Sequence, residues 1–207
     1  MSSTGFWFVG TAKPELVARL RGELPTDSFE PPPEGTDLAW WQAMDQQATL
    51  FAPPDPRYSC PGPSDAARRF VENLDTLRPD SGSRCTCMRA LNEIPEDEIF
   101  HVGIRKGDPV AALYYGLGYA DAARLPGRFG CFLLTAEDVR SSLAAIDHLS
   151  ERPDLGRDEF AARTTAWLSA VSDEPELDPY TLLDGPLRVL RLAREQGVGA
   201  LGFMEWY

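Results

Sequence analysis

The sequence predicts one α/β domain of the α+β kind, whose core contains both the N-terminal and the C-terminal strand. Two observations lie at the chain ends: residues 6–9 are wholly apolar, and the last ten residues carry Leu201, Phe203 and Met204. Between them, apolar residues recur at helical intervals of three and four. With 207 residues and 43% hydrophobic content, the chain can bury one core without a metal or disulfide, so we expect a single domain over 1–207.

The first elements form a strand followed by a helix. The apolar run at 6–9 predicts a buried strand that Gly10 ends. Four apolar residues between 16 and 24 then share one helical face, which predicts a helix there.

Two proline-rich stretches interrupt the next part of the chain. Prolines at 25–37 and 52–64 exclude regular structure and predict surface loops. A helix is expected between them at 38–51, capped by Asp37, and another after Ser64 that buries Phe70 and Leu74. Residues 78–86 are expected to form a further loop.

The second half has clearer boundaries. Residues 99–104 predict a strand, and Asp108-Pro109 predicts the start of a helix that Gly116 and Gly118 end. Residues 129–134 predict the next strand, and Thr135 with Asp138 forms a variant capping box that starts another helix.

The closing segments are two helices and a strand. Helices are expected at 158–171 and 179–196, with Gly185-Pro186 kinking or restarting the second and Gly197 ending it. Residues 198–207 predict the final strand, buried on at least one face.

The charge balance limits the classes of partner. Acidic residues outnumber basic ones 32 to 20, giving a net charge of −12, which disfavours nucleic acid and anionic membrane surfaces. The possible partners are a basic protein or a small molecule. Neither a signal peptide nor a run of ~20 apolar residues is present, so we expect a soluble cytoplasmic protein with no membrane partner; its oligomeric state stays open.

Cysteine spacing argues against a metal site. Cys85 and Cys87, with Cys60 upstream and Cys131 or His101 downstream, supply enough soft ligands for zinc, but a C-x-C pair is not a zinc knuckle. We expect reduced thiols and no metal, while the role of Cys60, Cys85 and Cys87 as free thiols or ligands stays open. No cofactor is expected either, because the glycine pattern at 116–121 lacks the third glycine of a dinucleotide site.

Five residues are candidates for a binding site. Trp41 and Asp45 share a face of the helix expected at 38–51, and a carboxylate beside an indole suits a partly buried site. Tyr114 could line a pocket, and His101 or Glu205 could act as an acid or base. The alternative is that the aromatic residues belong to the core and the acids to a solvated surface.

Several segments, in order, resemble the YfbM-like family, the domain of unknown function DUF1877. The similar segments are Gly5–Leu24, Asp37–Leu50 with Trp41 as the helix tryptophan, Asp108–Gly116, Gly127–Val139 and Leu187–Tyr207. The resemblance implies an α/β domain with a small mixed sheet flanked by helices, and it implies no established activity. In this chain Asp45 stands where the family often has a histidine, and residues 52–100 form an elaboration outside the pattern.

Two functions remain open at this point. The first is an acidic binding or interaction protein, of the immunity or accessory type, that meets a basic partner. The second is a small-molecule enzyme whose pocket is lined by Trp41 and Tyr114, with Asp45, His101 or Glu205 as acid or base. No G-x-S-x-G motif supports a hydrolase.

Overall fold

The computed structural model describes residues 3–25, 29, 70–72, 74–75, 78–150, 157–174 and 176–207. The predicted loops at 25–37 and 52–64 and the predicted helix at 38–51 therefore lie almost wholly outside the described residues. The described elements nevertheless include both ends of the chain, which define the sheet.

Four strands form one sheet in the order β2-β1-β4-β3. Their bounds are Thr4–Ala12 for β1, Ile99–Arg105 for β2, Phe132–Leu134 for β3 and Gly199–Trp206 for β4. The α/β class and the place of both terminal strands in the sheet are confirmed. A mixed sheet was expected, but the described sheet is antiparallel at all three strand pairings. Each successive strand runs opposite to the one before it, because each connection returns the chain in the opposite direction.

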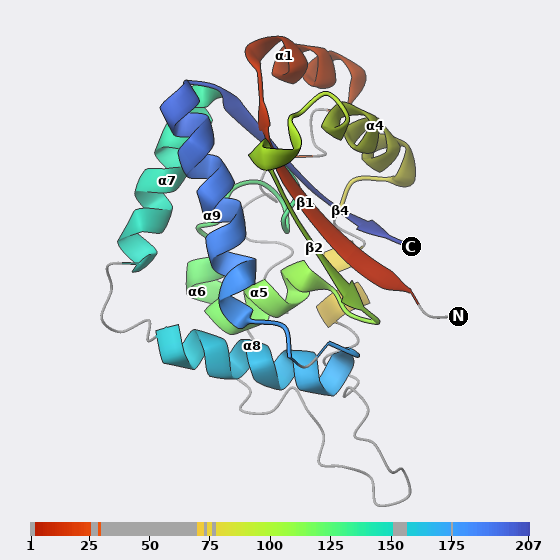
Figure 1. Ribbon diagram of the computed structural model, residues 1–207, viewed down its shortest axis with the longest axis vertical. Helices are drawn as coiled ribbons and strands as arrows, with labels where there is room; N and C mark the ends of the chain where they lie inside the picture. The colour runs from red at the N-terminus through yellow and green to blue at the C-terminus, as the bar shows by residue number, and fades with distance from the viewer. Residues whose placement is uncertain are drawn as a thin grey trace, which may run out of the picture.

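Helices cover both faces of this sheet (Figure 1). On one side lie α1 (Pro14–Glu23) and α4 (Ser81–Leu91). On the other lie α5 (Pro109–Leu117), α7 (Ala136–Ser150) and α9 (Pro179–Gln196), with α8 (Arg157–Val171) and the short α6 (Tyr119–Ala122) packed beyond them. We call these the α1/α4 side and the α9 side.

Alternation along the central strand divides the core between the two sides. Trp7 and Val9 point to the α9 side, where the Trp7 indole donates to the carbonyl of Gly130 at 2.9 Å. Phe8 points to the α1/α4 side and stacks on its cross-strand neighbour Phe203 at 5.3 Å between ring centroids. The buried residues of both sides form one continuous core.

Three of the predicted capping residues, Asp108, Thr135 and Gly197, start or end their helices as expected. Asp108 accepts a hydrogen bond from the Ala111 amide at 2.8 Å, so α5 begins where its cap predicts. Thr135 and Asp138 exchange hydrogen bonds at the start of α7, and Gly197 ends α9 at φ 68°. Helix α9 runs through Pro186 as one helix.

The prediction of a loop at 78–86 is wrong, because α4 starts at Ser81. Its first seven residues are mostly Ser, Gly, Thr and Cys, which form helices weakly, but the Asp80 carboxylate accepts from the amides of Gly82 and Ser83 and starts the helix. Cys87, Ala90 and Leu91 are buried on the face that α4 turns to the core. Tertiary packing thus stabilises a helix that weak local propensity concealed.

None of the described helices combines the length and the apolar character that a bilayer crossing requires.

Candidate functional site

The three predicted site residues that the structure describes do not meet in one place. Trp41 and Asp45 lie outside the described residues. His101 and Glu205 lie on the α1/α4 side, where they flank β1 as neighbours of Phe8 and Phe6, respectively. Tyr114 lies on the α9 side, so the sheet separates it from the other two.

An aromatic strip crosses the strands on the α1/α4 side. We call Phe6, Phe8, His101, Phe203 and Tyr207 the aromatic strip. The Phe8 ring stacks on Phe203 and on His101, and its centroid lies 6.2 Å from that of the His101 ring. The centroid of the Phe6 ring lies 6.0 Å from that of Phe8 and 5.6 Å from that of Tyr207. Phe203 is fully buried, Phe6 and Phe8 are half-buried, and His101 and Tyr207 are exposed. The strip is therefore covered at β4 and open towards β2.

Glu205 borders this strip through an ion pair with α4. Arg84 Nε lies 3.5 Å from Glu205 Oε2, and both side chains are 18% exposed. The other Glu205 oxygen accepts from the Trp206 amide at 3.1 Å. Glu205 thus has a structural partner on each oxygen.

Tyr114 is a buried residue of the α9 side. Burial raises the pKa of its phenol well above the ordinary value, while hydrogen bonds from the backbone at Gly130 and Phe129 act in the opposite direction. The phenol therefore stays protonated near neutral pH and is unsuited to act as a base.

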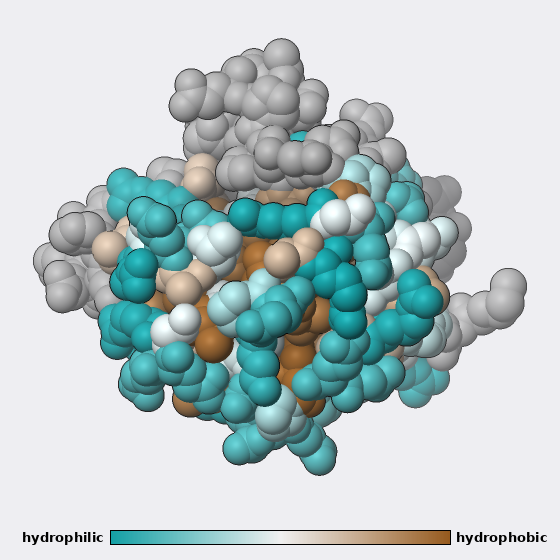
Figure 2. Space-filling model, turned by 90° about the horizontal axis from the view of Figure 1, so that it is seen from above, coloured by the Kyte–Doolittle hydropathy of each residue, from teal (hydrophilic) through white to brown (hydrophobic). Residues whose placement is uncertain are grey.

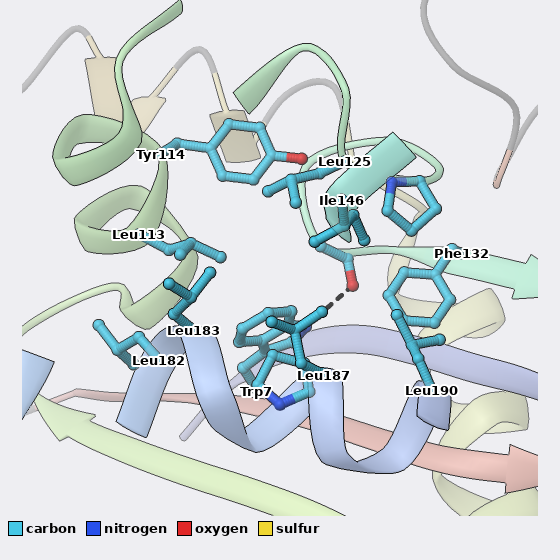
Figure 3. Close-up of a pocket in the computed structure, with 13 residues that line it drawn as sticks. Trp7, Leu113, Tyr114, Leu125, Phe132, Ile146, Leu182, Leu183, Leu187 and Leu190 are labelled. Carbon is cyan, nitrogen blue, oxygen red and sulfur yellow. Dashed lines mark hydrogen bonds between the residues drawn. The ribbon is translucent and has the colours of Figure 1, made fainter. Parts of the chain in front are cut away.

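The cavity beside Tyr114 is small and apolar. Figure 3 shows Leu113 and Tyr114 reaching it from α5 and Leu182, Leu183, Leu187 and Leu190 from α9, with the dashed bond from Trp7 below. About 30 Å³ is free, which is room for about one water-sized sphere. In the described structure the space between these apolar side chains is therefore a packing gap.

A buried ion pair that the sequence did not predict lies on the same side. Arg78 NH1 is 2.6 Å from Asp108 Oδ2 and NH2 is 3.1 Å from Oδ1, and both side chains are wholly buried. Arg78 Nε also donates to the carbonyl of Phe129 at 3.4 Å. The pair joins the segment before α4 to the start of α5 and to the turn before β3. Only Asp108 of this pair was noted in the sequence, and its role as the N-cap of α5 gave no indication that it also pairs with Arg78.

Carboxylates gather where β1 ends and β2 begins. The short helix η2 (Glu96–Glu98) directly precedes β2, and a hollow of about 130 Å³ beside it is lined by Glu15, Glu93 and Glu98 together with Lys13 and Thr11. We call Glu15, Glu93, Glu96, Asp97 and Glu98 the acidic end. Figure 2 looks onto the end of the molecule where α1 lies, and hydrophilic side chains surround hydrophobic surface there. This end offers several carboxylates to a cation within a short span.

Several of these carboxylates have no basic partner. Glu93 pairs with Arg19 at 2.5 Å, and Glu98 is held by Thr11 and Gln196. Glu15, Glu96 and Asp97 are exposed, and no ion pair to them is found among the described residues. Three negative charges at this end are thus left for solvent or a partner.

The described cysteines lie in different surroundings. Cys85 is exposed, whereas Cys87 and Cys131 are buried. Burial, reinforced by the nearby Cys131, raises the pKa of Cys87 to about 12. In the described part of the chain, no three His, Cys, Asp or Glu side chains are placed to share a metal ion, and Cys60 lies outside that part.

Comparisons of the chain with models of protein families, with curated proteins and with solved structures gave no match.

Proposed function

We propose that this chain is a binding protein for a basic protein, and that the acidic end receives basic side chains of that partner. The observation that carries the proposal is the group of exposed carboxylates Glu15, Glu96 and Asp97 beside a hollow that itself contains Glu93 and Glu98. A chain of the immunity or accessory type would fit this description, with the basic protein as the partner that it captures.

Electrostatics supports the choice of a basic partner. The net charge of −12 attracts cations at long range, and clustered carboxylates concentrate that attraction in one place. Two of the neighbouring cations are engaged already: Arg19 pairs with Glu93 and Glu23, and Arg188 donates to the carbonyls of Asp97 and Ile99. Lys13 lines the hollow itself, so an incoming lysine or arginine would compete mainly with this one side chain.

The enzyme alternative finds less support. An acid or base acting in a pocket lined by Tyr114 would have to share that pocket, but His101 and Glu205 lie across the sheet from it. The free space beside Tyr114 is also too small for a substrate.

Charge neutralisation tests the proposal. The triple variant Glu15→Gln, Glu96→Gln, Asp97→Asn removes the unpaired carboxylates of the acidic end. The probe is a short labelled oligolysine peptide, and its affinity is measured by fluorescence anisotropy over a range of salt concentrations. We expect the variant to bind at least about threefold more weakly at low salt, because each exposed pair contributes about 0.2–1 kcal/mol.

A matched control separates location from net charge. The triple variant Asp158→Asn, Glu159→Gln, Glu176→Gln removes three exposed carboxylates elsewhere and changes the net charge equally. It should bind the peptide nearly as the parent chain does. Equal weakening in both variants, or affinity that does not fall with salt, would contradict the proposal.

A further inference from the structure

The free edge of β2 adjoins the acidic end. In the described sheet β2 pairs with β1 alone, so its other side is an edge (Figure 1). Helix η2, with Glu96 and Asp97, runs directly into the first residue of β2. A segment bound at the acidic end would therefore be positioned to continue along this strand.

Hydrogen-bond alternation shows which β2 groups point outward. Thr4 and Tyr207 exchange both main-chain hydrogen bonds, so the main-chain groups of Thr4, Phe6 and Phe8 face β4. Those of Gly5, Trp7 and Val9 consequently face β2, opposite Ile104, Val102 and Phe100. The main-chain groups of the alternate residues Ile99, His101, Gly103 and Arg105 then point away from the sheet.

Both ends of this edge are already covered, and its centre is not. The carbonyl of Ile99 accepts from Arg188 at 2.9 Å, and the carbonyl of Arg105 accepts from the Asp173 amide at 3.0 Å. Between them, the outward N–H and C=O groups of His101 and Gly103 have no hydrogen-bond partner among the described residues. Two donors and two acceptors therefore form a window for an added strand.

Charge at one end of the window favours a basic occupant. Exposed Glu96 and Asp97 lie beside Ile99, where Arg188 is bound to main-chain carbonyls. At the other end, Arg105 and Lys106 pair with Asp173 and balance the charges of Asp173 and Glu174. The seven residues of β2 span about 20 Å, which an extended segment of similar length would match.

We propose that an extended, basic segment of the partner adds to β2 as a fifth strand of the described sheet, with main-chain hydrogen bonds to His101 and Gly103 and basic side chains at the end beside Glu96 and Asp97. This inference rests on the proposed function and identifies the binding mode. Alternate side chains of the added strand would lie beside His101 and extend the aromatic strip, where an arginine could stack on the exposed rings. The edge supplies affinity and the strip supplies selectivity.

Proline substitution tests the main-chain contact. His101→Pro removes an outward N–H without touching the β1–β2 hydrogen bonds, and an edge strand tolerates proline at such a position. His101→Ala is the matched control, because it removes the same side chain and keeps the N–H. With a labelled extended peptide that carries two arginines at one end and alternating threonine and valine along the rest, we expect His101→Pro to bind about two- to tenfold more weakly than His101→Ala.

Two further measurements protect the test against a folding defect. Hydrogen–deuterium exchange of the parent chain should show fast exchange at His101 and Gly103, slow exchange at Val102, and protection of the first two when the peptide is bound. A version of the peptide N-methylated along one edge should bind as weakly to the parent chain as the unmodified peptide binds to His101→Pro. Slow exchange at His101 and Gly103 in the free chain would overturn the inference.

The outcomes distinguish the inference from the proposed function. If neutralising the acidic end weakens binding but His101→Pro and N-methylation do not, the basic partner stands and strand addition is refuted. If neither the oligolysine peptide nor the extended peptide binds at low salt, both proposals are refuted.

Discussion

Replacing Arg78 by methionine should destabilise the fold more than any surface charge change. The substitution leaves the Asp108 carboxylate wholly buried, with the Ala111 amide as its remaining hydrogen-bond donor and no other cation paired with it among the described residues. Removing one partner of a buried pair costs about 3–5 kcal/mol, because the remaining charge has lost its compensation. For a chain of this length that corresponds to a fall of roughly 6–20 °C in Tm.

A double-mutant cycle measured by urea unfolding checks this reasoning. Asp108→Asn keeps an oxygen for the cap of α5 but removes the negative charge, and it should also destabilise the fold, because the Arg78 cation is then buried alone. The double variant Arg78→Met, Asp108→Asn should lose less than the two single variants combined, by about 2 kcal/mol or more. Arg21→Met is the control, since its pair with Asp138 is half exposed and should cost less than about 1 kcal/mol. Strict additivity, or an Arg78→Met effect no larger than that of Arg21→Met, would refute the reasoning.

Three more predictions concern reactivity, acid stability and the sheet edge. A thiol reagent at neutral pH should modify Cys85 quickly and Cys87 only on unfolding, as peptide mapping would show, because Cys87 is buried and has a pKa of about 12. Burial raises the pKa of Asp138, but hydrogen bonds from Thr135 outweigh burial and hold this pKa below its ordinary value. The carboxylate therefore stabilises the fold above the unfolded-state pKa of about 4, and this stabilisation is lost as the pH falls through the lower pKa of the folded state. Asp138→Asn should therefore unfold with a weaker pH dependence below about pH 4, and an unchanged dependence would contradict this. Arg188→Ala removes the bonds that cover one end of the β2 edge, so sedimentation should show more self-association with rising concentration, and an unchanged monomer fraction would count against edge protection.

Local signals predicted the helices and strands that carry clear caps or apolar runs. Asp108, Thr135 and Gly197 mark the boundaries of their helices correctly, because capping depends on neighbours within a few residues. Helix α4 was missed because its Gly, Ser and Thr content hides it and its stability comes from packing on β4. The third strand proved shorter than expected, since Phe129 and Gly130 form a tight turn with positive φ instead of extended chain.

The arrangement of the candidate site was beyond the sequence. His101 and Glu205 come to one face only because β2 and β4 both pair with β1, and such long-range register has no local signature. Tyr114 was predicted beside a pocket and does line a cavity, but its separation from the other two depends on which side of the sheet α5 packs. The partner of Arg78 was equally hidden, because 30 residues separate it from Asp108.

The position of β4 between β1 and β3 affects how the molecule is made. Translation produces β1, β2 and β3 before β4, so β3 emerges with no described neighbour to pair with, and one side of β1 stays open. Vectorial folding can complete the β1–β2 pair but cannot join it to β3 until β4 has been made. The nascent chain consequently carries unpaired strand edges until β4 emerges, and such edges make a folding intermediate prone to aggregation.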